Sequence, residues 1–388
     1  MRDAPVVILG SGLAGYSVAR ELRRLDADVP LTVLSRDGAS AYAKPSLSNA
    51  LAAGTRADRI ATASADDQRR TLRADVRPHT AVTRIDTASR RVECEGAAIE
   101  YRALVLALGA DPVKLPIGGD ASSEVRAVND LDDYADFRAR LDATRARRGR
   151  PRVAIIGAGL IGAEFANDLA ATDHDVTVID VSPQALGRLL PREGAALLEA
   201  ALGALGVRFA LGRSVSRVDR DGDALRVTLS DGSDVTADVV LSAVGLAPRT
   251  SLATASGLTV RRGIVVDRTL QASAPDVYAL GDCAEVEGLV LPFVAPLLHC
   301  ARALARTLAG TPTPVVYPPM PVVVKTPAMP IVVSPPRRVT GAWHLDGRSD
   351  GLVARYEVDG ALEGFALVGP SAVKERAALT KLLPPMLA

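Results

Sequence analysis

Two stretches of the chain share one pattern of apolar and polar positions. The first opens with the apolar run Val6 to Leu9, and the second with a similar run that begins at Arg152. Each run leads into a glycine-rich turn, after which apolar residues recur at helical spacing, so both stretches predict strand, turn and helix. The turn glycines are Gly10, Gly12 and Gly15 in the first stretch and Gly157, Gly159 and Gly162 in the second.

This glycine spacing matches a dinucleotide-binding turn. One glycine permits the bend, one lets a pyrophosphate approach the backbone, and one lets the helix pack closely on the strand. The unpaired N–H groups and the positive end of the helix dipole then face the phosphates. A single match of this kind also fits an ordinary strand–helix connection, so the rest of the chain decides.

Two further segments recur in the same order as the glycine turns. LTVLS at residues 31–35 is echoed by VTVID at residues 176–180, and ALVLALGADP at residues 103–112 by DVVLSAVGLAP at residues 238–248. Unrelated glycine turns would not bring their flanking strands with them, so the chain contains two copies of a dinucleotide-binding unit.

The segments around the second copy also carry structural signals. Residues 111–120 are rich in Pro and Gly and predict a crossing between domains. Asn129 and Asp130 are candidate caps of a helix over residues 131–147. Arginines recur along this helix, and acidic neighbours favour a solvated face over a docking patch. Farther on, Val277 to Leu280 predicts a buried strand, and a helix is predicted from Pro296, where a first-turn proline belongs.

The last region, residues 318–388, has a different sequence pattern from the two dinucleotide-binding units. It contains two β-branched strands between prolines, a hairpin that turns at Asp359–Gly360, and a final helix over residues 372–383. We therefore predict an α/β fold with two Rossmann-like dinucleotide-binding domains, the second inserted in the first, and a small C-terminal α+β domain. The predicted ranges are 1–112 with 240–317, then 113–239, and finally 318–388.

Composition excludes several other classes of protein. The chain has 388 residues, 46 basic and 45 acidic, and a net charge of +1, which gives no reason to expect nucleic acid or an anionic membrane as partner. The run at residues 6–9 is too short for a signal peptide, and the run at residues 289–298 is too short to span a bilayer and contains two prolines. We expect a soluble cytoplasmic protein.

Cysteine and histidine usage narrows the chemistry. Cys94, Cys283 and Cys300 form no closely spaced pair, so neither a disulfide framework nor a redox-active dithiol is expected. The four histidines are scattered, and no metal site is expected.

Five motifs together carry a resemblance to a known family. The motifs are YAKPSLS at residues 42–48, GLIGAEFANDL at 159–169, GIVVD at 263–267, YALGDCAEV at 278–286 and VKTPAMPIVVSPP at 324–336. They resemble the FAD-dependent pyridine nucleotide oxidoreductases with two dinucleotide-binding domains, and within that family the rubredoxin–NAD reductases. The resemblance covers essentially the whole chain, and the segment at 324–336 is far more specific than the glycine turns.

The resemblance implies that the first copy binds FAD. Asp282 would then bond the ribityl chain, and the helix from Pro296 would direct N–H groups at the flavin pyrimidine carbonyl. Val82 matches a position whose backbone meets adenine, although an ordinary strand residue explains it equally well. Many family members end the second strand with an acidic residue that binds the adenosine ribose of FAD, and Ser35 occupies that place here. Asp37 could supply the carboxylate instead, so the residue that contacts this ribose is left open. The implied residues are Gly10, Gly12, Leu13, Ala14, Gly15, Ser35, Lys44, Pro45, Val82, Gly281, Asp282, Val294, Pro296 and Lys325.

The second copy is expected to bind NADH. Asp180 ends its second strand, near the usual distance from the first glycine for a carboxylate that binds a ribose 2′-OH and repels a 2′-phosphate. Arg188 and Arg192 weaken this preference if either turns towards the 2′ position. The residues implied here are Gly157, Gly159, Ile161, Gly162, Glu164 and Asp180.

Three charged residues are candidates for catalysis. Lysine is scarce in this chain, yet Lys44 and Lys325 both lie in family motifs near the flavin. A compact ammonium would stabilise the reduced or half-reduced flavin, although ordinary surface lysines beside prolines are the alternative. Glu164 approaches the flavin with a lysine in related enzymes. In the ferredoxin-reductase branch this lysine follows the Pro-Pro-Leu-Ser motif, but Asn49 occupies that place here, so Lys44 is the expected partner of Glu164. Alternatively, Glu164 is an acid at the start of a helix that interacts favourably with the helix dipole.

The implied reaction is hydride transfer from NADH to FAD, followed by single-electron transfer to an external iron centre. Rubredoxin is the first candidate acceptor; a ferredoxin or a rubredoxin-like domain of a flavodiiron protein is the alternative. An NADH-responsive flavoprotein sensor is the alternative outside enzymes. Arg337 and Arg338 are candidate contacts for an acidic partner, and we expect a monomer.

Overall fold

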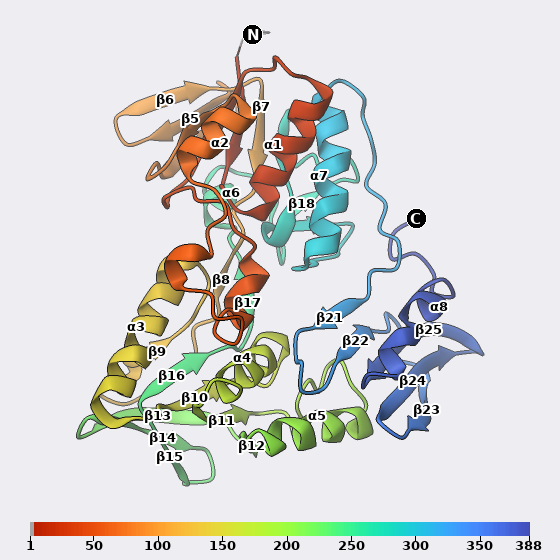
Figure 1. Ribbon diagram of the computed structural model, residues 1–388. Coiled ribbons are helices and arrows are strands. Elements are labelled where there is room, and N and C mark those ends of the chain that lie inside the picture. The colour runs from red at the N-terminus through yellow and green to blue at the C-terminus, as the bar shows by residue number, and fades with distance from the viewer. Residues whose placement is uncertain (1–3) are drawn as a thin grey trace.

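The computed structural model describes residues 4–388 and confirms the predicted α/β class with two Rossmann-like units and a small C-terminal domain. Figure 1 shows the first unit above, the second below it, and the C-terminal domain in blue beside the second.

The first sheet has five parallel strands in the order β19-β7-β1-β2-β3. Its central strands are buried along their whole length, as expected for a parallel sheet covered on both faces. Helices α1 and α7 pack side by side against it (Figure 1). The bounds are β1 Val6–Leu9, β2 Leu31–Leu34, β3 Asp75–Arg77, β7 Ala103–Leu106, β19 Val277–Ala279, α1 Leu13–Leu25, α2 Ala65–Leu72, α6 Ser251–Ala255 and α7 Val294–Leu308.

A three-stranded antiparallel sheet accompanies each unit, and a small parallel pair completes the first. The bounds are β4 Val82–Asp86, β5 Arg91–Cys94 and β6 Ala97–Glu100 in the first unit, β13 Val215–Asp221, β14 Ala224–Leu229 and β15 Asp234–Ala237 in the second, and β18 Ile264–Val266 with β20 Ala284–Val286 in the pair. The structural repeat therefore includes these antiparallel sheets.

The second parallel sheet has the order β12-β11-β10-β16-β9. Its strands are β9 Val125–Arg126, β10 Arg152–Ile156, β11 Asp175–Asp180, β12 Arg208–Leu211 and β16 Val239–Ser242, with helices α3 Leu131–Arg148, α4 Leu160–Ala170 and α5 Arg192–Ala204. The predicted boundary at residue 240 cuts β16, which pairs with β10 throughout. We therefore propose that the second domain extends to Ser242.

The two units are joined by a pair of crossing strands. β8 Ala110–Pro112 and β17 Leu246–Pro248 pair antiparallel where the chain leaves and re-enters the first unit. The glycine turns follow β1 and β10, so each lies at the carboxyl ends of its parallel sheet, where open α/β sheets bind ligands.

The C-terminal domain is an antiparallel sheet in the order β21-β22-β25-β24-β23. Its strands are β21 Val322–Val324, β22 Ile331–Ser334, β23 Ala342–Arg348, β24 Gly351–Val358 and β25 Ala361–Val368. The hairpin at Asp359–Gly360 is as predicted, whereas β23 was not predicted. It is an edge strand with mostly exposed side chains, so it lacks a clear apolar alternation.

Two helix boundaries differ from the sequence analysis, whereas the start of helix α3 agrees with it. The final helix is shorter than predicted, with a 3₁₀ turn over Ala372–Glu375 and α8 over Arg376–Thr380. Helix α7 starts at Val294, which places Pro296 at its third position, still within the first turn. Helix α3 has Asp130 as its cap, since the Asp130 side chain accepts from Asp133 N.

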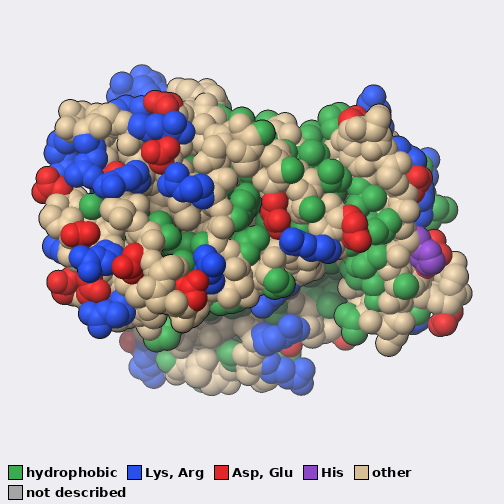
Figure 2. Space-filling model, turned by 90° about the horizontal axis from the view of Figure 1, so that it is seen from below, with side chains coloured by type: hydrophobic (Ala, Val, Ile, Leu, Met, Phe, Trp, Pro, Cys, Tyr) green, Lys and Arg blue, Asp and Glu red, His purple; other side chains and the backbone are tan. Residues whose placement is uncertain are grey.

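The outer surface carries both signs of charge. Figure 2 shows Lys and Arg intermixed with Asp and Glu on the face seen from below, with no area of one sign alone. Among residues 4–388, no helix is long and apolar enough to cross a membrane, and no group of three or more potential ligands gathers to hold a metal ion.

Candidate functional site

A cavity of about 1890 Å³ lies where the three domains meet. Both glycine turns, the 3₁₀ segment Lys44–Asn49, the start of α7 and residues 320–325 contribute to its wall. The predicted residues that line it are Gly10, Gly12, Leu13, Ala14, Ser35, Lys44, Pro45, Val82, Gly157, Gly159, Ile161, Glu164, Asp180, Asp282, Val294 and Lys325. Four other predicted residues are not part of the wall, namely Gly15, Gly162, Gly281 and Pro296.

The outer glycines of each turn are required by packing. Gly10 has φ +115° and Gly157 has φ +111°, and a Cβ on either would collide with the carbonyl of Ala107 or Ala243, respectively. A Cβ on Gly15 or Gly162 would collide with the carbonyl of the first glycine of its own turn. Gly15 and Gly162 therefore act by letting the helix approach the strand.

The middle glycines have a different role. Gly12 and Gly159 have ordinary extended dihedral angles, and a Cβ on either would meet no atom within 4 Å. They are the N-caps of α1 and α4, and neither cap makes a side-chain hydrogen bond. Each helix thus presents unpaired N–H groups and an open backbone to the cavity, which is what a pyrophosphate requires. The residues present therefore fit two dinucleotides.

A hydroxyl–carboxylate cluster lies at the end of β2. The Ser35 Oγ donates to Asp37 Oδ1 at 2.6 Å, and it also lies 2.6 Å from the Ser11 Oγ of the glycine turn. Asp37 Oδ1 in turn accepts from Ala39 N at 2.9 Å. Asp37 is exposed and lines the cavity, so a carboxylate is available just after the end of β2.

Asp180 occupies the equivalent place in the second unit. Its Oδ2 accepts from Ala158 N at 2.5 Å, and its Oδ1 from Ser182 N at 2.7 Å, so the carboxylate also fixes the glycine turn. Arg188 lines the cavity, whereas Arg192 turns away and donates to Pro183 O at 3.2 Å. The alternative raised for Arg192 is thus not favoured.

Arg213 was not singled out by the sequence. It lines the same end of the cavity, and its Nε lies 2.8 Å from Asp231 Oδ2. The neighbouring sequence does not identify Arg213 as a cavity residue, because it follows β12 and is not part of any recognisable motif.

Glu164 pairs with Lys325 and not with Lys44, contrary to the expected partner. The Lys325 ammonium forms an ion pair with Glu164 Oε2 and also donates to Ser48 Oγ at 3.1 Å. The Ser48 hydroxyl donates to Glu164 Oε2 at 2.5 Å, and Lys325 N donates to Glu164 Oε1 at 3.0 Å. One residue from each domain meets here, which no local pattern in the sequence reveals.

Lys44 lies beside a different set of groups. Its ammonium donates to Asn129 Oδ1 at 2.5 Å. Burial lowers the pKa of Lys44, and the nearby Asp282 carboxylate opposes that shift. Burial likewise raises the pKa of Asp282, against the attraction of Lys44 and Arg249.

Arg249 is a second cavity residue that the sequence reading missed. Its Nε donates to Asp111 Oδ1 at 2.6 Å and its Nη1 to Leu108 O at 2.8 Å, so it bridges the two crossing strands beside Asp282. The sequence did contain a signal for Arg249, because this residue directly follows the segment at 238–248 that repeats the segment at 103–112 of the first unit.

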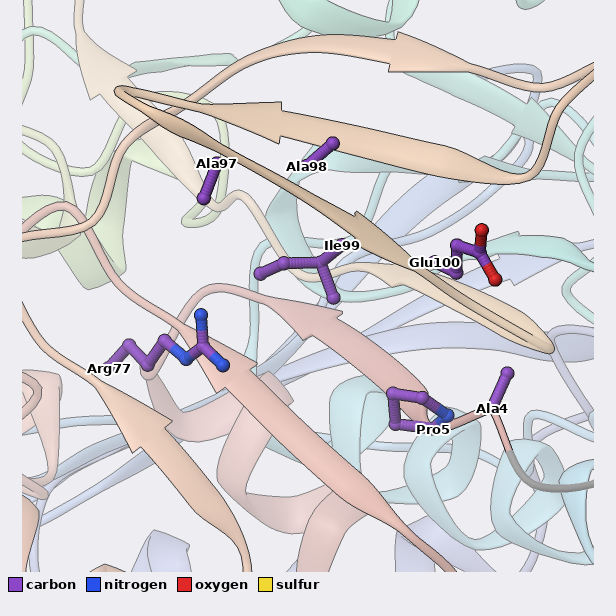
Figure 3. Close-up of a pocket in the computed structure, with 7 residues that line it drawn as sticks. All are labelled: Ala4, Pro5, Arg77, Ala97, Ala98, Ile99 and Glu100. Atoms are coloured by element: carbon purple, nitrogen blue, oxygen red, sulfur yellow. The ribbon is translucent and has the colours of Figure 1, made fainter.

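A second hollow, of about 510 Å³, lies between β6, the residues just before β1 and the end of β3 (Figure 3). Alanines, Pro5 and Ile99 form much of its wall. Its one basic side chain, Arg77, is paired with Asp75 at 2.7 Å. This hollow lacks convergent polar groups and is separate from the cavity between the domains.

Comparison with known proteins agrees with this geometry. Residues 4–305 match the family described as pyridine nucleotide-disulphide oxidoreductase, and residues 314–383 match a rubredoxin binding C-terminal domain. A rubredoxin-NAD(+) reductase of Acinetobacter baylyi is 44% identical over 99% of this chain and 98% of its own length. A nitric oxide reductase FlRd-NAD(+) reductase of Aeromonas salmonicida is 39% identical over 94% of this chain and 92% of its own.

Among solved structures, a covalent putidaredoxin reductase–putidaredoxin complex has a TM-score of 0.87 and 25% identity, and the match covers 99% of this chain and 94% of that one. FAD and NADH are the cofactors of this group of enzymes, and the two uncapped glycine turns at one cavity fit them. The chain belongs to the pyridine nucleotide-disulphide oxidoreductase family, among its rubredoxin-NAD(+) reductases.

Proposed function

We propose that this protein is an FAD-dependent NADH:rubredoxin oxidoreductase. The observation that carries the proposal is the convergence of two uncapped glycine turns on one cavity, in a chain whose residues 314–383 match a rubredoxin binding domain. FAD, when bound, supplies the conversion of a two-electron hydride donor into single electrons.

The chain's own residues bind, orient and supply charge. Gly12 and the start of α1 hold the FAD pyrophosphate, and Gly159 with the start of α4 holds that of NADH. Lys325, held by Glu164 and Ser48, and Lys44, held by Asn129, place two ammonium groups on the cavity wall. Positive charge there stabilises negative charge that develops on reduction.

The thiols support an external acceptor over an internal dithiol. Cys283 and Cys300 are buried, and burial raises the pKa of each thiol to about 11, so neither is a thiolate near neutral pH. Electrons therefore leave through a carrier that docks on the surface. Three free cysteines also fit the cytoplasm, which we propose as the compartment.

A rubredoxin-like domain of a flavodiiron protein is the second candidate acceptor. It is favoured by the 39% identity to a relative named nitric oxide reductase FlRd-NAD(+) reductase.

Stopped-flow measurement with the purified flavoprotein tests these candidates. Rapid NADH-dependent reduction of added rubredoxin, with slow oxygen consumption, is the expected result. Faster reduction of a flavodiiron rubredoxin domain or of a ferredoxin would transfer the assignment to that acceptor. Flavin reduction by NADH without turnover on any iron carrier would refute the proposed electron transfer.

A further inference from the structure

Helix α4 has an unusual buried face. Glu164, Asn167 and Asp168 lie three and four residues apart and so share one side of the helix, yet each is at most 4% exposed. Buried polar side chains cost free energy unless they are hydrogen-bonded. The function proposed above uses Glu164 but assigns nothing to Asn167 or Asp168.

The partners of these side chains come from the other two domains. Asp168 accepts from Leu51 N at 3.1 Å and from Ala52 N at 2.8 Å, at the end of the segment 44–52. Asn167 Oδ1 accepts from Ala328 N at 3.0 Å, in the turn that follows Lys325. One helix of the second domain therefore holds a segment of the first and a turn of the third.

The segment 44–52 is fixed at three points along its length. Lys44 bonds Asn129 at its start, Ser48 bonds Glu164 in its middle, and Asp168 holds its end. Leu47 and Ala50 pack in the same hydrophobic cluster as the second domain, so the segment rests on that domain rather than on its own sheet. Figure 1 shows it beside α4 and the crossing strands.

We propose that Asp168 is a positioning residue, which anchors the segment 44–52 on α4 and thereby sets the places of Lys44 on the cavity wall and of Ser48 beside Glu164. The two N–H groups of Leu51 and Ala52 fit a carboxylate, because it accepts at both oxygens. Asn167 does the equivalent for the turn that carries Lys325. This inference deepens the proposed function and rests on it for the role of the lysines.

Hydrogen–deuterium exchange tests the anchor directly. Asp168→Asn keeps the size of the side chain but offers only one acceptor. We expect the amides of Leu51 and Ala52 to exchange at least about tenfold faster, the change that loss of one hydrogen bond to a charged group produces. The exchange rate of the Ala328 amide should be unchanged in Asp168→Asn and higher in Asn167→Ala, so each variant serves as a control for the other. Asp132→Asn, at an exposed position of α3, controls for loss of a carboxylate.

The bound flavin reports whether the anchor positions the lysines. In Asp168→Asn we expect a more negative flavin midpoint potential and slower reduction by NADH, with the FAD content unchanged. Unchanged exchange at Leu51 and Ala52 would overturn the anchor. Faster exchange with a wild-type potential and reduction rate would overturn the positioning role. Neither readout uses rubredoxin, so a wrong acceptor in the proposed function would leave both results interpretable.

Discussion

Replacing Gly159 with alanine separates binding of NADH from folding. Its φ of −75° and ψ of −169° suit any residue, and an added Cβ would meet no protein atom within 4 Å. Alanine reduces the freedom of the unfolded chain, which stabilises by about 0.4–1 kcal/mol, whereas alanine at a helix N-cap costs about as much relative to glycine. The free energy of unfolding should therefore change by less than about 1 kcal/mol.

The new methyl group would occupy the space above the first N–H groups of α4. A hydrogen bond to a charged group contributes about 1.5–3 kcal/mol, so loss of one to the NADH pyrophosphate weakens binding about 10- to 100-fold. The dependence of the flavin reduction rate on NADH concentration measures this change. We expect a higher apparent dissociation constant with a similar limiting rate and a normal FAD content.

Two matched variants complete the test. Gly12→Ala makes the equivalent change in the first turn and should lower FAD content instead of NADH affinity. Gly157→Ala should destabilise the fold by about 1–3 kcal/mol, because φ is +111° and the methyl would collide with the carbonyl of Ala243. Wild-type NADH affinity in Gly159→Ala, or loss of FAD from it, would refute the assignment of the second turn to NADH.

Three further predictions concern charge. Lys325→Ala and Lys325→Arg should slow the reduction of the flavin by NADH and shift the flavin midpoint potential. Lys114→Ala, at an exposed position, should change neither. An unchanged rate and potential in both Lys325 variants would reject the role of Lys325. Burial raises the pKa of Asp168 to about 6, against the hydrogen bonds from Ala52 N and Leu51 N. The folded state therefore binds a proton more tightly, and this group makes the protein about 1 kcal/mol less stable at pH 7 than at pH 5. Urea unfolding at both pH values should show that the difference disappears in Asp168→Asn. Charge reversal at Arg337 and Arg338 should weaken the ionic-strength dependence of rubredoxin reduction without changing ferricyanide reduction, and an intact dependence would contradict their docking role.

The glycine turns were predictable because their requirement is local. Gly10 and Gly157 need positive φ, and Gly15 and Gly162 must approach the turn backbone closely, so few other residues fit. The repeated strands around them then indicated two copies of one α/β unit, whereas the order of the strands within each sheet was not predicted. The domain boundary that we propose at Ser242 could not be predicted in this way, because the pairing of β16 with β10 leaves no mark in composition.

The partners of charged residues were not predictable in the same way. Lys325 and Glu164 are 161 residues apart, and Lys44 and Asn129 are 85 apart. Such contacts depend on how three domains dock, and sequence spacing carries no signal for that. The wrong partner for Glu164 followed from choosing the lysine nearest to a family position, although the ammonium that reaches it comes from the C-terminal domain.

Helix α4 connects the glycine turn proposed to bind NADH with the two lysines proposed to stabilise the reduced flavin. Its N-terminus opens onto the cavity, and its polar face holds the segments that carry Lys44 and Lys325. A rotation of the second domain about the crossing strands β8 and β17 would break these hydrogen bonds and leave buried polar groups unpaired, which costs about 1–3 kcal/mol for each group. The bonds of α4 therefore resist such a rotation, and the same contacts that hold the domains together fix the glycine turn before α4 relative to the two ammonium groups.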